Sequence, residues 1–369
     1  MRTAIISDLH LGLASGGDVL RDPGLQEILI GEIASADRVL LLGDVVELRE
    51  QSVGRALDSA RPFFERLGAA LGGGEVILVP GNHDHRFAEP ILDRLDVEGV
   101  PLGLEHLGDP SSGPTEELSA FLGPVRLRIA YPGIWLRDDV YATHGHYCDP
   151  HIRLPRAECV AVALVARIRG SLPAAAVPAD YERLLRPIYG IAYAAAQGRS
   201  RPVGHQQTAA ESAWEVLAGE RSDGFKGRAA RAGFPWAIRG LNSLLHTDFE
   251  PDISPAAIFR SGVDAATEMS KRLGLDDATV ITGHTHRPGP LPGEAEWALP
   301  GGGGLHNTGS WVFSSAFHQP GTPPTPYWPG TVTWLEDNQP PKRVQLLQKL
   351  SHAQLIDLVN RAARRDAGG

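Results

Sequence analysis

Five short apolar runs in this chain each end in a cluster of histidine, aspartate or asparagine. The runs and their clusters read TAIISDLH, RVLLLGDVVE, VILVPGNHDH, DVYATHGHYCD and ATVITGHTHR. Short apolar runs bounded by glycine and polar residues are typical of strands buried on both faces of a sheet. In layered α/β proteins, ligands bind beyond the carboxyl ends of such strands. We therefore expect the five clusters to converge at one rim.

The segments between the first three runs have the periodicity of helices. Apolar residues recur at helical spacing over 23–36 and over 55–71, and three glycines at 72–74 end the second segment. A Gly/Pro/Ser-rich stretch over 101–114 predicts a loop. Strands that alternate with helices in this way predict an α/β fold with a layered architecture.

The interval 150–275 reads as helical and interrupts the strand pattern. Its helix signals are a capping box, a proline suited to a first turn, and a Ser-Pro start closed by glycine: Thr208 with Glu211, Pro235, and Ser254-Pro255 with Gly274. We interpret the interval as a large helical cap inserted into a core formed by 1–149 and 276–350.

The last part of the chain is expected to close the sheet. Strands are predicted around 307–313, 331–335 and 343–347, with Asn307 in a turn. The remaining segment, 351–369, is predicted to form an amphipathic helix and a tail.

Composition narrows the function classes. The formal charge of −9 and the pI near 5.9 argue against a protein that coats nucleic acid, so stable nucleic-acid binding is not expected. Cys148 and Cys159 are the two cysteines, which favours a reducing compartment. No apolar run approaches the roughly 20 residues that span a bilayer, and the N-terminus leaves no room for a cleavable signal. We expect a cytoplasmic protein.

In chain order the clusters read Asp-x-His, Gly-Asp-x-x-Glu, Gly-Asn-His-Asp, His-Gly-His and Gly-His-x-His. This series resembles the calcineurin-like metallophosphoesterases, through SDLH, GDVVE, GNHD, THGH and GHTH in the family's order. The resemblance implies a layered β-sandwich flanked by helices, and a metal-dependent enzyme that hydrolyses phosphate ester or pyrophosphate bonds. The second motif departs from the usual family pattern, because Glu47 stands where the family has aspartate.

The resemblance also implies seven ligands for two divalent cations. They are Asp8, His10 and His286 for one ion, Asn82, His144 and His284 for the other, and Asp44 as the bridge between them. Imidazole nitrogens mixed with carboxylate and amide oxygens suit Mn, Fe or Zn better than Mg, and we expect Mn²⁺ with Fe or Zn as alternatives. Two such cations neutralise a phosphate and acidify a bridging water.

Further roles follow from the same comparison. His83 resembles the acid that protonates the departing oxygen, and Glu47 would orient its imidazole. His146 is expected at the cavity mouth, where it contacts either the substrate or a neighbouring polar group. Arg287 forms either a phosphate clamp or a structural salt bridge.

Two residues of the third cluster carry smaller expectations. Asp84 is expected to hydrogen-bond backbone in its turn. His85 lies outside the matched pattern and is expected to face either substrate or solvent.

The leading function is hydrolysis of a small-molecule phosphoester or pyrophosphate. GHTHRP and the helical insert look like the UDP-2,3-diacylglucosamine hydrolase branch, which cleaves a pyrophosphate and holds acyl chains beneath its insert, although GNHD replaces that branch's usual Gly-Asn-Arg-Asp. A nuclease or cyclic-nucleotide phosphodiesterase could use the same metals. A non-catalytic scaffold is the third class, but such relatives are expected to lose ligands or the acid, and this chain keeps them.

Overall fold

The computed structural model of the protein describes residues 1–111, 113–198, 225–295, 297–314, 317 and 324–367. Its ten strands form one sheet in the order β10-β9-β1-β2-β3-β5-β6-β7-β8, with β4 paired to β5. The strands are β1 (Arg2–Ile6), β2 (Arg38–Leu41), β3 (Glu75–Leu78), β4 (Glu105–Gly108), β5 (Arg126–Arg137), β6 (Val140–Thr143), β7 (Thr279–Thr282), β8 (Gly304–Asn307), β9 (Thr331–Glu336) and β10 (Lys342–Gln345).

Helices occupy most of the described connections. The α-helices are α1 (Pro23–Ile33), α2 (Val53–Leu71), α3 (Glu89–Glu98), α4 (Pro114–Leu122), α5 (Ala157–Arg169), α6 (Pro178–Gln197), α8 (Phe225–Leu245), α9 (Pro255–Arg272) and α10 (His352–Ala367). Short 3-10 turns are η1 (Val19–Arg21), η2 (His85–Ala88) and η3 (His146–His151).

The sheet curls so that its two halves face each other. β5 pairs in parallel with β3 as far as Ile129 and in antiparallel fashion with β6 from Gly133, so this strand passes from one half to the other. Only glycine fits at 133, because an added Cβ would collide with the backbone carbonyl of Ala142 on the neighbouring strand. Residues of both halves fill the space between them, including Ile5, Leu40, Ile77, Ala142 and Ile281. The predicted α/β sandwich is confirmed.

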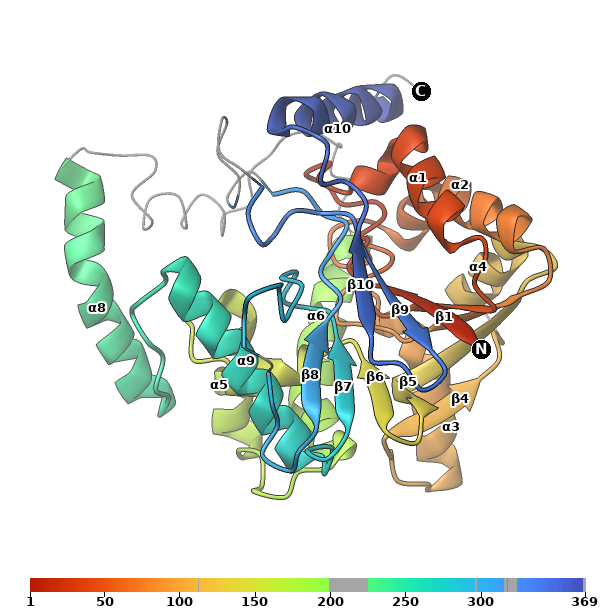
Figure 1. Ribbon diagram of the computed structural model, residues 1–369. Coiled ribbons are helices and arrows are strands. Elements are labelled where there is room, and N and C mark those ends of the chain that lie inside the picture. The colour runs from red at the N-terminus through yellow and green to blue at the C-terminus, as the bar shows by residue number, and fades with distance from the viewer. Residues whose placement is uncertain (112, 199–224, 296, 315–316, 318–323, 368–369) are drawn as a thin grey trace.

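Helices cover the two outer faces of the curled sheet (Figure 1). The alternate residues of β1, β2 and β3 point outward and pack with α1 and α2, through contacts that include Ile6 and Phe64. On the other half, Met269 of α9 belongs to one buried cluster with Tyr141 and Val280. The layers therefore run helix, sheet, sheet, helix.

Several local predictions can be compared with the helices. The segments predicted over 23–36 and 55–71 are α1 and α2, and Gly72 ends α2 with a φ of 67°. Ser254 caps α9 by accepting a hydrogen bond from the N–H of Ala257 at 3.2 Å, as predicted. The prediction for Pro235 was wrong, because it lies inside α8, where its missing N–H interrupts one turn of a helix that continues on both sides. The capping box of Thr208 and Glu211 lies outside the described residues.

The strand predictions were less accurate near glycine. The closing strand predicted at 307–313 is β8, which ends at Asn307 instead of starting there. It begins among glycines because Gly303 lies against the backbone of Ala278, where an added Cβ would clash. Strand β4 interrupts the loop predicted at 101–114, and β5 was not predicted. β9, β10 and α10 lie where the sequence places them.

Between β6 and β7 the described chain forms η3, α5, α6, α8 and α9, and α8 lies farthest from the sheet (Figure 1). Treating 150–275 as a cap and 351–369 as a separate terminal segment remains a proposal. Across the described ranges, no helix has both the length and the apolar character needed to cross a membrane.

Candidate metal centre

The predicted polar clusters meet at the rim where the strands of both sheet halves end. In the described chain, seven non-glycine residues have a positive φ, and five of them are predicted ligands: Asp8, His10, Asp44, His284 and His286. A left-handed backbone costs such residues about 1–3 kcal/mol each and persists where the surrounding structure fixes it. Strain concentrated in this way marks the rim as a functional site.

Ligand-type atoms approach one another closely at this rim. Three overlapping groups each have their nitrogen and oxygen atoms within 4.8 Å of one another: Asp8, His10 and His286; His10, Asp44 and His83; and Asp44, His144 and His284. Asp44 joins the last two groups, since its Oδ2 lies 3.2 Å from His144 Nε2 and 3.6 Å from His10 Nε2. The structure thus brings the predicted residues together in one cluster.

Outer partners orient three of the histidine rings. The Nδ1 of His10 lies 3.0 Å from Glu47 Oε2, the Nδ1 of His144 lies 3.0 Å from the Leu42 carbonyl, and the Nε2 of His284 lies 2.8 Å from Asp149 Oδ1. Each partner is an acceptor, so each of these nitrogens carries the proton and the other nitrogen is left as a lone-pair donor facing the cluster. Metal-binding histidines are held in the same way.

Asn82 adds an amide to the second group. One terminal atom of its carboxamide lies 3.2 Å from His144 Nε2, from Asp44 Oδ2 and from His284 Nδ1, and the other lies 2.9 Å from Arg49 Nη1. Hydrogen bonding alone favours the amide nitrogen toward these acceptors, whereas a cation among them favours the oxygen. The orientation of this amide is therefore coupled to cation binding.

The electrostatics of the cluster favour positive charge. Burial by itself would lower the pKa of His10 and of His144, but the hydrogen bond of Glu47 and the charge of Asp44 raise the first to about 9. The charge of Asp44 and its hydrogen bond raise the pKa of His144 to about 10. Protein groups that hold protons this strongly would also attract a divalent cation, which competes with those protons.

These observations test whether the residues fit two divalent cations. The Nε2 of His10 is buried without a hydrogen-bond partner in the described structure, and lone pairs from several other side chains face the same space. A mixed set of nitrogen and oxygen donors with oriented rings is the chemistry of a transition-metal site. The residues fit.

Comparison with known proteins relates part of this sequence to a family. Residues 1–163 match the calcineurin-like phosphoesterases. This part of the chain belongs to the calcineurin-like phosphoesterase family. The matched range contains Asp8, Asp44 and His144, while His284 and His286 lie beyond it. This chain belongs with the metal-dependent hydrolases of phosphate esters.

The chain was also compared with solved structures and with curated protein sequences. A crystal structure of a dimetal phosphatase from Danio rerio aligns with 94% of this chain and 99% of its own, at 10% sequence identity and a TM-score of 0.35. A search of curated protein sequences gives no match.

His83 of this phosphoesterase faces the same cavity as the predicted ligands. Its side chain is 21% exposed, and its Nδ1 lies 2.6 Å from Glu47 Oε2. Burial alone would raise the pKa of Glu47, but the charge of His83 and the hydrogen bonds from both histidines lower it well below its usual range. Glu47 is therefore a fixed anion that holds His83 and His10 through one oxygen.

Asp84 stabilises the turn that presents Asn82. Its carboxylate accepts hydrogen bonds from the N–H groups of Val45 at 2.7 Å and Gly81 at 2.6 Å, and from those of Asp44 and Val46 at longer range. Burial and the nearby charge of Asp44 raise its pKa to about 6. The predicted backbone role is confirmed.

Two other predicted positions differ from expectation. His85 faces neither substrate nor solvent, because it is 4% exposed and its Nε2 lies 3.0 Å from Glu182 Oε2 on α6. His146 does not line the cavity mouth; it is 1% exposed, and its Nε2 lies 3.2 Å from the Tyr131 hydroxyl. Helix α6 packs over both histidines and removes them from the surface.

Arg287 takes the structural alternative that the sequence left open. Its guanidinium forms an ion pair with Glu294 and lies 3.9 Å from the centre of the Phe259 ring. It lines a separate cavity beside the predicted ligands.

The sequence reasoning missed several residues of this site. The cavity lined by His10, Asp44 and Asn82, called the metal cavity below, has a volume of about 200 Å³. Its walls also include Asp149 of η3 and, from the inserted helical segment, Arg156 and Glu158. Arg49 also belongs to the site, because it contacts both Asn82 and Glu158. Asp149 could have been found, since η3 directly follows His144 and turns the chain back toward the rim. No local pattern marks the two arginines.

Proposed function

We propose that this phosphoesterase hydrolyses phosphate ester or anhydride bonds of a small-molecule substrate at a site for two divalent cations, with Mn²⁺ as the first candidate. The observation that supports this proposal is the convergence of oriented nitrogen and oxygen donors with His83 in one cavity of about 200 Å³. When bound, the cations would neutralise the phosphate charge and make water a stronger nucleophile.

The ligand set remains the one that the sequence implies. Asp8, His10 and His286 would hold one ion, and Asn82, His144 and His284 the other, with Asp44 between them. The close approach of these side chains supports the assignment. Asp149 would fix the ring of His284 from outside through its 2.8 Å hydrogen bond.

His83 would supply the proton for the departing oxygen. Its Nδ1 is held by Glu47, which leaves Nε2 as the atom that can exchange a proton with a bound molecule. Its partial exposure on the cavity wall supports this role. Glu47 would act as a positioning residue, because it touches the imidazole and not the cavity.

The test combines metal analysis with hydrolysis. Purified protein should contain about two divalent ions per chain and should hydrolyse at least one of a panel of monoesters, diesters and pyrophosphates with Mn²⁺ added. Plasmid DNA and a cyclic nucleotide belong in the panel, because they separate the nuclease and cyclic phosphodiesterase alternatives. Metal binding without any turnover would favour a non-catalytic scaffold.

His83→Ala tests the proton donor. The variant should keep both metals and lose roughly 10²- to 10⁴-fold in rate on alkyl esters, whose leaving oxygen needs a proton. p-Nitrophenyl esters should lose much less. Loss of metal, or an equal loss of rate on both ester types, would overturn this assignment.

A cytoplasmic location is part of the proposal. The described structure supports it through Cys148 and Cys159, which are both buried free thiols.

A further inference from the structure

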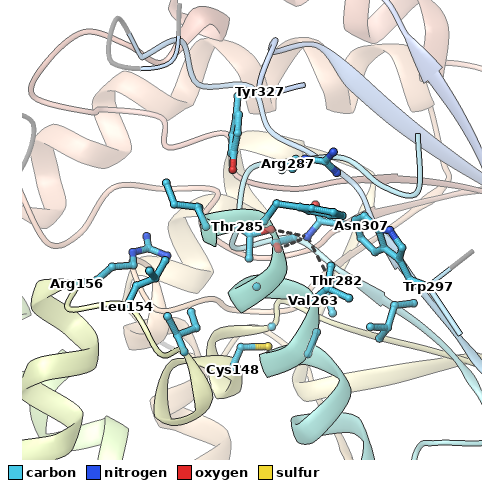
Figure 2. A pocket seen from close by; sticks show the side chains of 18 residues that line it. Cys148, Leu154, Arg156, Val263, Thr282, Thr285, Arg287, Trp297, Asn307 and Tyr327 are labelled. Carbon is cyan, nitrogen blue, oxygen red and sulfur yellow. Dashed lines mark hydrogen bonds between the residues drawn. The ribbon is translucent and has the colours of Figure 1, made fainter. Parts of the chain in front are cut away.

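A second cavity lies beside the metal cavity, between α9 and the loop that carries Thr285 (Figure 2). Its volume is about 50 Å³. Most of its wall is apolar and includes Leu154, Ile258, Phe259, Val263, Trp297 and Leu305. Arg156 lines this cavity and the metal cavity alike, so the two adjoin at its side chain.

Two of the other polar residues on this wall, Asn307 and Arg287, are already paired. The side-chain amide of Asn307 donates to Thr282 Oγ1 at 3.3 Å and to Thr285 Oγ1 at 3.1 Å. Arg287 is paired with Glu294 and packs on Phe259. Because Asn307 and Arg287 are paired, the cavity offers an entering molecule mainly apolar surface, with the Tyr327 hydroxyl as a polar group on its wall.

Arg156 is a charged residue on this wall that is not paired in the described structure. Within the described residues its guanidinium has no hydrogen bond and no ion pair, and its side chain is open to solvent. It immediately precedes α5 and stands at the opposite end of the cavity from Trp297 (Figure 2). A free, planar guanidinium at the edge of a metal cavity suits the oxygens of a phosphoryl group.

We propose that the substrate is a phosphate ester that carries a compact apolar group, with its phosphoryl oxygens against Arg156 and the apolar group in the second cavity. The inference rests on the proposed function and names its substrate class. One water molecule needs roughly 10–15 Å³ of cavity volume, so the second cavity can hold on the order of four carbon atoms. A long acyl chain, as in the UDP-2,3-diacylglucosamine hydrolase branch, is too large for it.

Binding of alkylphosphonates to the Mn²⁺-loaded protein tests the size. Methyl-, ethyl-, butyl- and octylphosphonate are titrated by calorimetry, because they place the same anion at the metals and differ only in the chain. Affinity should rise roughly fourfold per methylene up to about four carbons and then level off. The proposal is wrong if affinity is flat from methyl onward, if it climbs steadily to octyl, or if no phosphonate binds.

Two variants separate the parts of the site. Gly262→Leu on α9 should abolish the gain with chain length, because a Cβ at this position meets only the Thr285 methyl group at 3.5 Å and the added side chain then fills the cavity. Gly31→Leu on α1 is the matched control, since a Cβ there meets nothing within 4 Å. A chain-length dependence that survives Gly262→Leu contradicts the placement of the apolar group.

Arg156→Gln should lower the affinity for every phosphonate by roughly tenfold or more, because one charge-assisted hydrogen bond is lost. The dependence of affinity on chain length should remain. An unaltered affinity removes Arg156 from the proposal. Hydrolysis distinguishes this inference from the function beneath it. If no ester is cleaved while the dependence on chain length persists, the proposed function fails and the cavity assignment stands. If the protein is active but shows no dependence on chain length, the cavity assignment fails and the proposed function stands.

Discussion

Glu47 offers the sharpest test of the site, because one of its oxygens serves two imidazoles. Its Oε2 lies 2.6 Å from His83 Nδ1 and 3.0 Å from His10 Nδ1, while its Oε1 accepts the backbone N–H of Arg49 at 3.0 Å. Glu47→Gln keeps the shape of the side chain and leaves a single oxygen for three donors. Whichever way the amide turns, at least one of these hydrogen bonds is lost.

The expected magnitude follows from those contacts. A hydrogen bond to a charged group contributes about 1.5–3 kcal/mol, and each 1.4 kcal/mol is a factor of ten in rate. Losing the hold on His83 should therefore lower kcat/KM for alkyl esters by roughly 10- to 100-fold. Losing the hold on His10 should weaken metal binding by about 10- to 100-fold.

The assay separates these two effects. Metal affinity is measured by competition with a chelator, and hydrolysis is measured at saturating metal with an alkyl ester and a p-nitrophenyl ester. The matched control is Glu50→Gln, because Glu50 accepts the N–H of Ala14 at 3.2 Å and forms no hydrogen bond to either histidine in the described structure. If Glu47→Gln leaves metal affinity intact and slows both esters equally, Glu47 does not act through His10 and His83.

Three further changes test the charge balance and the packing. Asp44→Asn removes the carboxylate between the two ligand groups and should abolish both metal content and turnover; elemental analysis that still finds about two ions in an active variant contradicts its bridging role. Burial, reinforced by the charge of Arg343, lowers the pKa of His306 to about 3, so the unfolded chain gains this proton below about pH 6.5 while the folded chain does not. This contribution to the free energy of unfolding is therefore complete above pH 6.5 and is lost as the pH falls toward 3. Urea unfolding at pH 4.5 should show a loss of about 3 kcal/mol relative to neutral pH. His306→Gln should remove this pH-dependent loss, and the exposed control His246→Gln should retain it. Glu182→Ala leaves the buried hydroxyls of Tyr131 and Tyr147 without their shared acceptor and should lower the free energy of unfolding by at least about 2 kcal/mol, whereas an equal effect of Glu27→Ala on the exposed face of α1 would refute this reason.

The sequence predicted the parts of the molecule that local signals determine. Apolar runs located β1, β2, β3, β6 and β7, and their polar endings named the residues that meet at the rim. This worked because parallel neighbouring strands deliver the residues after their carboxyl ends to the same edge of the sheet. The strand register aligns these carboxyl ends, because Ile6 pairs with Leu41 and Leu41 pairs with Leu78.

Features that depend on distant partners were not predictable. His85 looks like a surface residue in its own turn, and only the packing of Glu182, far along the chain, shows that it is buried. Strand β5 escaped notice because Pro132 and Gly133 interrupt its pattern, although they lie where the strand crosses between sheet halves. Arg156 has no motif, and its place at the cavity follows only from how α5 packs near the rim.

The separation of roles in this protein has a structural origin. β6 and β7 are parallel neighbours, with Ala142 opposite Ile281, so His144 and His284 are placed by strand pairing whatever chain connects them. The helices between these strands can therefore change without moving the candidate ligands. The same inserted segment supplies Arg156, and its helix α9 supplies Ile258, Phe259 and Val263 to the apolar wall of the second cavity. Chemistry at phosphorus would then be set by strand ends, and the choice of substrate by the inserted helices.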